Sequence, residues 1–318
     1  MSNILITGAT GFIGSNLVRS LVKKKHNITI LTRKNSNLWR LEDITLHFEV
    51  KRIDLLRFTK LRQEIREIKP DIVYHCATYG LHPSQKDLKT IMNTSVIASA
   101  NFMKALVEYN DLHRFVNLGS SHEYGSKLRK IRETDTTLPV TAYGIAKLAQ
   151  THLTRYFTLM NRLPATTLRL FTTYGKFEEP GHLISDIMFA LVKRKALKII
   201  SPKTTRDFIY IQDIIMALHK AAEIKHVEGE IFNIGSGVKY STLEILNFVK
   251  KIDDFNINVI FNHEKQTTAD RVSVNGSANI EKAEKLLRWK PAFSIKQGLL
   301  ETYNWYKNNI RLYSDPQR

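Results

Sequence analysis

The stretch from residue 3 to 18, NILITGATGFIGSNLV, decides the fold of this 318-residue chain. Its first five residues form a short apolar run, which is typical of a buried strand. From Phe12 to Val22, apolar residues recur at helical spacing, so a helix follows the strand closely. The sequence therefore predicts a strand, a tight turn and a helix at the start of the chain.

Three glycines occupy this turn, at Gly8, Gly11 and Gly14. The first permits the tight turn, the second lets backbone approach a pyrophosphate, and the third lets helix pack on strand. The helix N-terminal amides would then face the phosphates. The spacing GxxGxxG differs from the GxGxxG fingerprint, but its position between the first strand and the first helix indicates a dinucleotide-binding loop.

Strand-like runs alternate with helical patterns along the next part of the chain. Strands are expected at 28–32, 46–50, 71–77, 114–119 and 165–171, and helices at 61–68, 87–109 and 142–160. This alternation implies parallel βαβ units with right-handed crossovers that cover both faces of a sheet. The predicted fold class is α/β, a Rossmann-type doubly wound parallel sheet.

Beyond Tyr174 the alternation loosens, which predicts a smaller α/β C-terminal lobe. We expect helices at 183–192, 243–249 and 278–287, a strand or turn followed by a helix within 207–222, and a strand at 231–234. Residues 1–174, with a return of the chain at about 207–237, are expected to form the Rossmann domain. About 175–206 and 238–318 would form the second lobe.

The composition limits the class of protein. Hydrophobic residues make up 43% and charged residues 25%, which excludes global disorder. No apolar run reaches the ~18 residues of a membrane span, and no basic leader precedes an apolar stretch, so we expect no membrane partner and a cytoplasmic protein. The single cysteine, Cys76, excludes an intrachain disulfide. The net charge of +18 attracts phosphates, nucleic acids or acidic surfaces without selecting among them.

The end of the second expected strand bears on the cofactor. An NAD site usually places Asp or Glu there, but this chain reads Thr32-Arg33-Lys34. A basic side chain can pair with a 2′-phosphate, so the sequence favours NADP(H) over NAD(H), with Arg33 as main contact. Alternatively, Arg33 is an exposed surface residue. Asp54, at the end of the third strand, either reaches the adenine edge or starts a helix.

Tyr143 and Lys147 lie four residues apart on an expected helix and therefore share one face. A free tyrosine is a poor acid–base group at neutral pH because its pKa is about 10. A nearby ammonium stabilises the phenolate and lowers that pKa. Such a pair can move a proton at a carbinol oxygen while a nicotinamide exchanges a hydride.

With these features the chain resembles the extended short-chain dehydrogenase/reductase family of nucleotide-sugar epimerases, dehydratases and reductases. The resemblance covers nearly the whole length. Besides Tyr143 and Lys147 it rests on TGATGFIG (7–14), HCATYG (75–80), GSSHEYG (119–125), RLFTTYG (169–175), RDFIYIQD (206–213), FNIGSG (232–237) and LLRWKP (286–291). It implies a Rossmann domain and a smaller lobe that binds the nucleotide sugar.

The resemblance also implies roles for individual residues. Tyr143 would be the acid–base group, and Lys147 would also hold the nicotinamide ribose. A serine after the fifth strand would bond the reacting sugar oxygen; we favour Ser121 and keep Ser120. Glu123 stands where dehydratases of the family use a base. The expected cofactor contacts are Gly8, Thr10, Gly11, Phe12, Ile13, Gly14, Arg33, Asp54, Leu55, Ala77, Thr78, Tyr79, Tyr143 and Lys147.

The substrate contacts are expected in the second half of the chain and in one loop. Arg206 and Arg271 resemble the arginines that grip the substrate diphosphate. Thr172 stands near the place of a family asparagine, and His82 lies in a loop that often faces the sugar. No metal site is expected.

The leading functional hypothesis is NADPH-dependent reduction of a nucleotide 4-keto(-6-deoxy) sugar, because the second strand ends without a carboxylate. The alternatives are a nucleotide-sugar 4-epimerase with retained NAD and then a 4,6-dehydratase based on Glu123. A different class, a non-catalytic cofactor sensor or nucleic-acid binder, is motivated by the charge alone, and the basic residues lack the clustering of a nucleic-acid site. The resemblance implies a homodimer in which the helices at 87–109 and 142–160 pair as a four-helix bundle.

Overall fold

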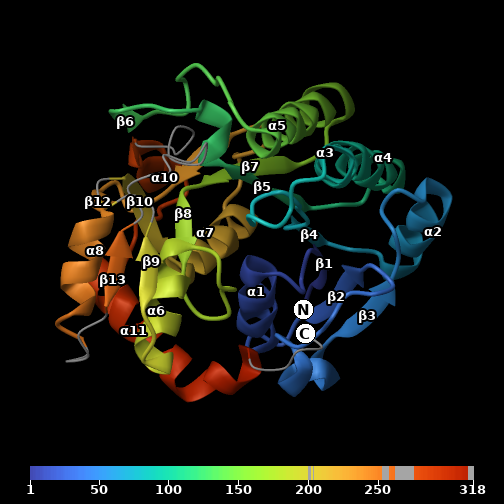
Figure 1. The fold of residues 1–318 in the computed structure, drawn as a ribbon. Helices are drawn as coiled ribbons and strands as arrows, with labels where there is room; N and C mark the ends of the chain where they lie inside the picture. The colour runs from blue at the N-terminus through green and yellow to red at the C-terminus, as the bar shows by residue number, and fades with distance from the viewer. Residues whose placement is uncertain (200–201, 203, 253–257, 262–275, 314–318) are drawn as a thin grey trace.

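The structure is a computed structural model that describes residues 1–199, 202, 204–252, 258–261 and 276–313. Its centre is a parallel seven-stranded sheet in the order β11-β7-β5-β4-β1-β2-β3 (Figure 1). The strands are β1 (Asn3–Thr7), β2 (Asn27–Thr32), β3 (Glu49–Arg52), β4 (Ile72–His75), β5 (Arg114–Ser120), β7 (Ala165–Leu170) and β11 (Ile231–Ile234). This confirms the predicted Rossmann-type α/β fold.

The third strand begins later than the sequence predicted. Residues Glu42–His47 form a short 3₁₀ helix, η1, and the strand occupies Glu49–Arg52. Leu46, which the alternation placed in the strand, is 96% exposed. Because β3 is an edge strand with a half-buried pattern, the local alternation of apolar residues is a weak guide to its start.

Helices cover both faces of the sheet, as the βαβ pattern requires. One face carries α2 (Phe58–Ile68), α4 (Ala98–Tyr109) and α5 (Ala142–Asn161), and the other carries α1 (Phe12–Val22) and α7 (Ile211–Glu223). The expected helix at 87–109 is α3 (Leu88–Met92) and α4 joined by a π-helical turn, η2 (Asn93–Ile97). The apolar core on the α1 and α7 side continues into the second lobe.

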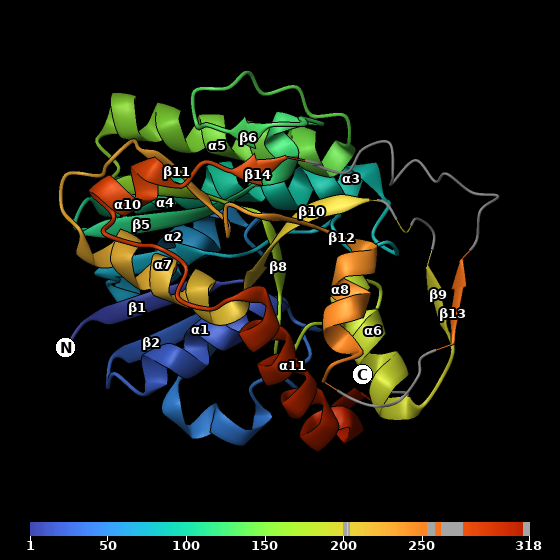
Figure 2. The same cartoon turned by 90° about the vertical axis from the view of Figure 1, so that its left-hand side faces the viewer.

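Small sheets and short helices lie beside the carboxyl ends of the central strands (Figure 2). Three strands form one sheet, and two further pairs bridge distant segments. The elements are β8 (Thr172–Tyr174), β10 (Thr205–Tyr210), β12 (Lys239–Ser241), β9 (Leu197–Ile199), β13 (Val259–Phe261), β6 (Lys130–Ile131), β14 (Ser277–Ala278), α6 (Leu183–Lys193), α8 (Thr242–Val249) and α10 (Glu281–Leu286).

One long helix was absent from the sequence-based expectations. Helix α11 (Ile295–Asn309) begins at a capping box formed by Ser294 and Gln297 and is followed by a 3₁₀ turn, η4 (Ile310–Tyr313). Its buried positions include Ile295, Leu299, Tyr303 and Tyr306. The capping box and this apolar spacing are the sequence signals that would have found it.

The fold brings several functional segments to one edge of the central sheet. The glycine turn follows β1, the HCATYG segment follows β4, and β5 ends at Ser120. The chain reverses direction across the sheet between β1 and β4, where open α/β sheets bind ligands beyond the carboxyl ends of their strands. Among the described residues, no helix combines the length and apolarity needed to cross a membrane.

Candidate active site

The glycine turn forms a cradle at the start of α1. Gly8 has a φ of +67°, and a Cβ there would lie 2.5 Å from the backbone nitrogen of Ala77. A Cβ on Gly14 would lie 2.2 Å from the carbonyl oxygen of Gly8. Gly11 caps the helix without a side chain, and the first turn carries no acidic residue. The N-terminal amides of α1 therefore suit a pyrophosphate, so this loop fits a dinucleotide cofactor.

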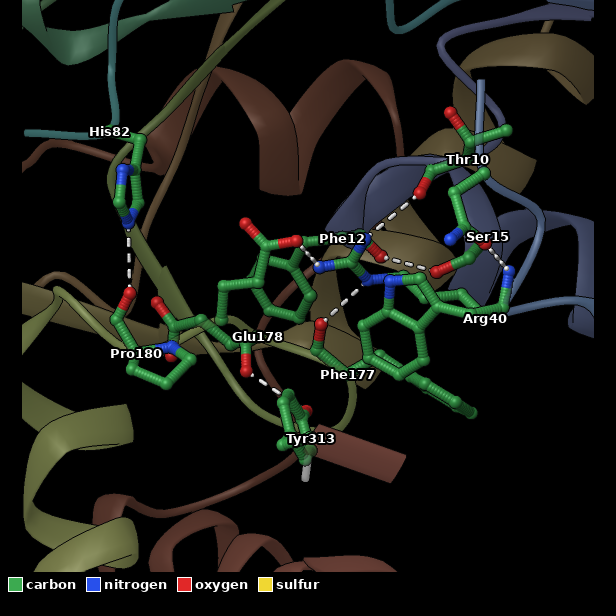
Figure 3. Close-up of polar contacts among 12 residues, drawn as sticks. Thr10, Phe12, Ser15, Arg40, His82, Phe177, Glu178, Pro180 and Tyr313 are labelled. Atoms are coloured by element: carbon green, nitrogen blue, oxygen red, sulfur yellow. Dashed lines mark hydrogen bonds and ion pairs between the residues drawn. The ribbon is translucent and has the colours of Figure 1, made fainter. Parts of the chain in front are cut away.

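A buried arginine ties this cradle to the loop after β8 (Figure 3). Arg40 donates from Nη1 to the carbonyl of Thr10 at 3.1 Å and from Nε to the carbonyl of Phe177 at 2.9 Å. Its Nη2 pairs with Glu179 at 2.7 Å. Sequence reasoning missed Arg40, since it belongs to no recognisable motif and its partners are far away along the chain.

The expected adenosine contacts lie at the ends of β2 and β3. Arg33 is exposed, and its backbone amide bonds the hydroxyl of Ser36 at 3.1 Å. Asp54 accepts from the backbone amide of Leu56 at 3.0 Å, so its carboxylate caps a turn before α2. Leu55 packs against the core on the α2 side. The geometry of Asp54 matches the helix-start alternative more directly than the adenine contact.

Tyr143 lies in the first turn of α5, buried beside the ends of β4 and β5. Burial raises its pKa to about 12, while hydrogen bonds from Ser120 and Thr78 act to lower it. The structure thus brings Ser120, the residue that we kept as second choice, to the phenol. Ser121 begins the short 3₁₀ helix η3 (Ser121–Tyr124) and is also buried.

Lys147 lies one helical turn after Tyr143 and is 2% exposed. Its ammonium donates to the carbonyl of Leu118 at 2.8 Å and to Oε1 of Gln150 at 2.9 Å. Burial lowers the pKa of Lys147 to about 8, while the nearby Glu123 and Cys76 act to raise it. This buried cation lies on the same helix face as Tyr143, as the sequence spacing predicted.

Glu123 occupies an internal ion pair. Its side chain is fully buried, and one carboxylate oxygen accepts from Nε of Arg169 at 2.7 Å. The other oxygen accepts from the backbone amide of Ser120 at 2.8 Å. Burial raises the pKa of Glu123, and Arg169 opposes the rise. Both oxygens therefore have protein partners, which favours a structural role over the base that a dehydratase would need.

His122 contacts Tyr143 and belongs to a group of neighbouring basic side chains. The ring of His122 meets that of Tyr143 edge to face at 5.6 Å, and the rings of His82 and His182 lie 5.7 Å apart. Burial lowers the pKa values of His122 and His182 to about 4, and the nearby charge of Arg206 acts in the same direction. Arg206 therefore lies near these histidines, although the arginine and the three histidines come from four separate segments of the chain.

The remaining substrate candidates are placed by the same loops. His82 bonds the carbonyl oxygen of Pro180 through Nε2 at 2.9 Å, which links the loop after β4 to the loop after β8 (Figure 3). Thr172 lies half-buried on β8 and is paired in register with Phe208 on β10. Arg271 lies outside the described residues. Across the parts of the chain that the structure describes, no cluster of His, Cys, Asp and Glu suits a metal ion.

Solved and curated proteins resemble this chain over almost its whole length. It shares 28% identity with the UDP-glucuronic acid 4-epimerase from Bacillus cereus, whose crystal structure contains UDP-glucuronic acid and NAD; the match covers 96% of this chain and 99% of that one, with a TM-score of 0.85. It is 28% identical to a UDP-glucuronate 4-epimerase of Thermodesulfobacterium geofontis, covering 98% of each. It is also 28% identical to an uncharacterized UDP-glucose epimerase of Bacillus subtilis, covering 93% of this chain and 95% of that one.

These similarities correct the leading functional hypothesis from the sequence. These three relatives are named as epimerases and the crystal structure among them holds NAD, so neither reduction as the main activity nor a preference for NADP(H) is supported. The absence of a carboxylate after β2 is a local feature, and it was not sufficient to predict either the cofactor or the reaction. The family model that describes the NAD-dependent epimerase/dehydratase family matches residues 4–235. The chain therefore belongs to the NAD-dependent epimerase/dehydratase family, as the sequence motifs indicated.

Proposed function

We propose that this protein is an NAD-dependent 4-epimerase of a UDP-sugar. The observation that carries the proposal is the placement of Ser120, Tyr143 and Lys147 at the sheet edge that also holds the glycine cradle. The 4-epimerases among the relatives support the reaction type and the UDP-sugar class. The dehydratase alternative loses its support because the carboxylate of Glu123 is held by Arg169 and Ser120.

NAD is the proposed cofactor, held by the cradle at Gly8, Gly11 and Gly14. When bound, it would accept a hydride from C4 of the sugar and return it to the opposite face. A retained NAD suits this reaction, because the two hydride transfers cancel and no external reductant is consumed. Equilibrium titration with NAD(H) and NADP(H) tests the choice, and tighter binding of NADP(H) would contradict it. Arg33, exposed at the end of β2, is the residue to replace if that occurs.

Tyr143 and the side chains near it would transfer the proton and bind the cofactor and the substrate. The Tyr143 phenolate takes the proton of the sugar 4-hydroxyl and the resulting phenol later gives it back, while Ser120 bonds the same sugar oxygen. The ammonium of Lys147 favours the phenolate form and holds the cofactor ribose. Arg206, grouped with His122 and His182, supplies positive charge for the diphosphate of the substrate.

The activity is tested by incubating the purified protein with UDP-glucose or UDP-glucuronate and NAD, and by following inversion at C4 by proton NMR. Replacing Tyr143 by Phe removes the acid–base hydroxyl and should reduce turnover by about 10²- to 10⁴-fold. Tyr156→Phe is the matched control on the same helix, because Tyr156 is 54% exposed. Consumption of NADPH with a nucleotide 4-keto sugar, without inversion of either UDP-sugar, would overturn the proposal.

We also propose how the chain divides into two lobes and that two copies form a dimer. Residues 1–174 with 207–237 would bind the cofactor, and the second lobe would bind the nucleotide sugar. Helices α4 and α5 lie side by side (Figure 1) and would pair with those of a second copy. Apolar side chains stay exposed on α5, at Ile145, Leu159 and Met160, and at Ile97, the last residue of η2 before α4. Sedimentation should give a dimer that Leu159→Glu weakens; a monomer at micromolar concentration would contradict this.

A further inference from the structure

A chain of buried hydrogen bonds connects Lys147 to the base of the glycine cradle. It runs through Thr7 at the end of β1, His75 at the end of β4, Ser99 on α4, and Gln150 and Lys147 on α5, and we call it the lysine network. The four links measure 2.7 Å from Thr7 to His75, 2.8 Å from His75 to Ser99, 3.1 Å from Gln150 to Ser99 and 2.9 Å from Lys147 to Gln150. Each of the five residues is at most 2% exposed.

The direction of the links near Lys147 follows from the chemistry of the groups. An ammonium only donates, so the amide oxygen of Gln150 must face Lys147. The amide nitrogen of Gln150 is thereby turned to Ser99 and donates to its hydroxyl oxygen. Lys147 therefore selects this orientation of Gln150, because a flipped amide would set two donors against each other, and Ser99 holds the amide nitrogen in it.

His75 keeps the far part of the network neutral. Burial lowers its pKa to about 3, and the charge of Lys147 acts in the same direction. A neutral imidazole has one N–H, and Thr7 Oγ1 already accepts from the backbone amide of Ala77 at 3.3 Å. The imidazole therefore donates to one of the two hydroxyls, Thr7 or Ser99, and accepts from the other.

The surroundings of Lys147 contain few compensating charges. From β4 and its end it faces the neutral His75 and the Cys76 thiol, whose pKa burial raises to about 12. Glu123 on η3 acts to raise the pKa of Lys147, but this carboxylate is itself paired with Arg169 of β7. On its own helix lies the neutral Tyr143. The two oxygens that contact the ammonium, those of Gln150 and Leu118, therefore contribute strongly to its charged form.

We infer that Gln150 is a positioning residue whose amide oxygen, oriented by Ser99 and His75, holds the Lys147 ammonium in place and stabilises its charged form. The inference deepens the proposed function and rests on it only in giving Lys147 a role toward the cofactor. The protonation state of Lys147 can be measured whether or not a substrate is turned over.

The inference makes opposite predictions for two replacements of similar shape. Gln150→Met removes the acceptor, which disfavours the ammonium and should lower the pKa of Lys147 by about one unit. Gln150→Glu supplies a carboxylate at the same place and should raise that pKa by about one unit. If the charged lysine is the active form, the alkaline limb of the rate profile moves to lower pH in the first variant and to higher pH in the second.

The experiment uses the full-length protein and its two variants. The titration of Lys147 is followed by competitive acetylation across pH with mass spectrometric detection, and the pH dependence of UDP-sugar inversion is measured in parallel. Gln63→Met is the matched control, because Gln63 is exposed on α2, where its side chain donates to Glu67 at 2.9 Å. It should leave both profiles unchanged.

Opposite shifts in the two variants support the inference. Shifts in the same direction, or unchanged midpoints for both, overturn it, because a purely structural role would reduce stability without moving the titration. If Gln150→Met does not fold, Ser99→Ala replaces it and should give a smaller downward shift, since Gln150 loses its orienting partner. Shifted acetylation midpoints without any inversion would separate a correct inference from a wrong proposed function.

Discussion

Two buried polar networks contact helix α5, and they satisfy their polar groups in different ways. The lysine network joins four neutral side chains to a single cation. The second, which we call the arginine network, comprises Glu123, Tyr124, Arg169 and Asn233, and its cation is paired with a carboxylate. Arg169 also lies over the ring of Tyr124, 4.6 Å from its centre.

The difference indicates what each network is suited to do. A buried ion pair resists titration, because either partner alone would be an uncompensated charge. A cation held only by neutral acceptors keeps a lowered pKa, and that of Lys147 falls to about 8. The arginine network therefore suits a fixed scaffold behind Ser120, whereas the lysine network places a titratable group where the cofactor is proposed to bind.

The largest effect is expected from breaking the arginine network. Arg169→Met leaves the buried carboxylate of Glu123 without its partner and should lower the free energy of unfolding by about 3–5 kcal/mol. Urea denaturation measures it. The double variant Glu123→Leu with Arg169→Met removes both charges and should recover more than half of the loss. A single variant that costs less than about 1 kcal/mol would remove the distinction between the two networks.

A smaller effect is expected at the end of the lysine network. Thr7→Val keeps the shape but deprives His75 and the amide of Ala77 of a partner, which should cost about 1–3 kcal/mol. Thr45→Val is the control, because the hydroxyl of Thr45 makes an exposed bond to the carbonyl of Glu42. Equal costs at the two sites, measured by thermal unfolding, would show that the buried chain adds nothing to stability.

The smallest effect concerns pH. His75 has a pKa of about 3 when folded and about 6.5 when unfolded, so the unfolded chain binds its proton first as pH falls. The stabilisation from neutral His75 is complete above pH 6.5 and is lost progressively below it. His75→Gln does not titrate. The stability difference between the parent and this variant should shrink by about 1–2 kcal/mol from pH 7 to 5.

Comparing the two proteins isolates His75 in that measurement. Other buried histidines, such as His122, His182 and His219, also have lowered pKa values, whereas buried carboxyls such as Asp207 have raised ones. All of them are present in both proteins and cancel in the difference. A pH-independent difference would mean that His75 has the same pKa in the folded and the unfolded chain.

The parts of the site that the sequence predicted are those set by local spacing. Gly8, Gly11 and Gly14 could be interpreted because strand, turn and helix follow each other directly. Tyr143 and Lys147 could be placed on one helix face because residues four apart share it. The choice between Ser120 and Ser121 was open, because it depends on how β5 ends against α5, and the hydrogen bond of Ser120 to Tyr143 is a tertiary contact.

The sequence by itself determined the family, the Rossmann sheet and the cofactor cradle, since periodicity and short motifs act within a few residues of each other. Only the tertiary structure decided that Glu123 lies in an ion pair, that Arg40 fixes the cradle, and that Gln150 holds Lys147. Arg40 and Thr10 are 30 positions apart, and Arg169 and Glu123 are 46 apart. Such contacts form when the sheet brings distant segments together, and no local pattern encodes which polar groups then meet in the core.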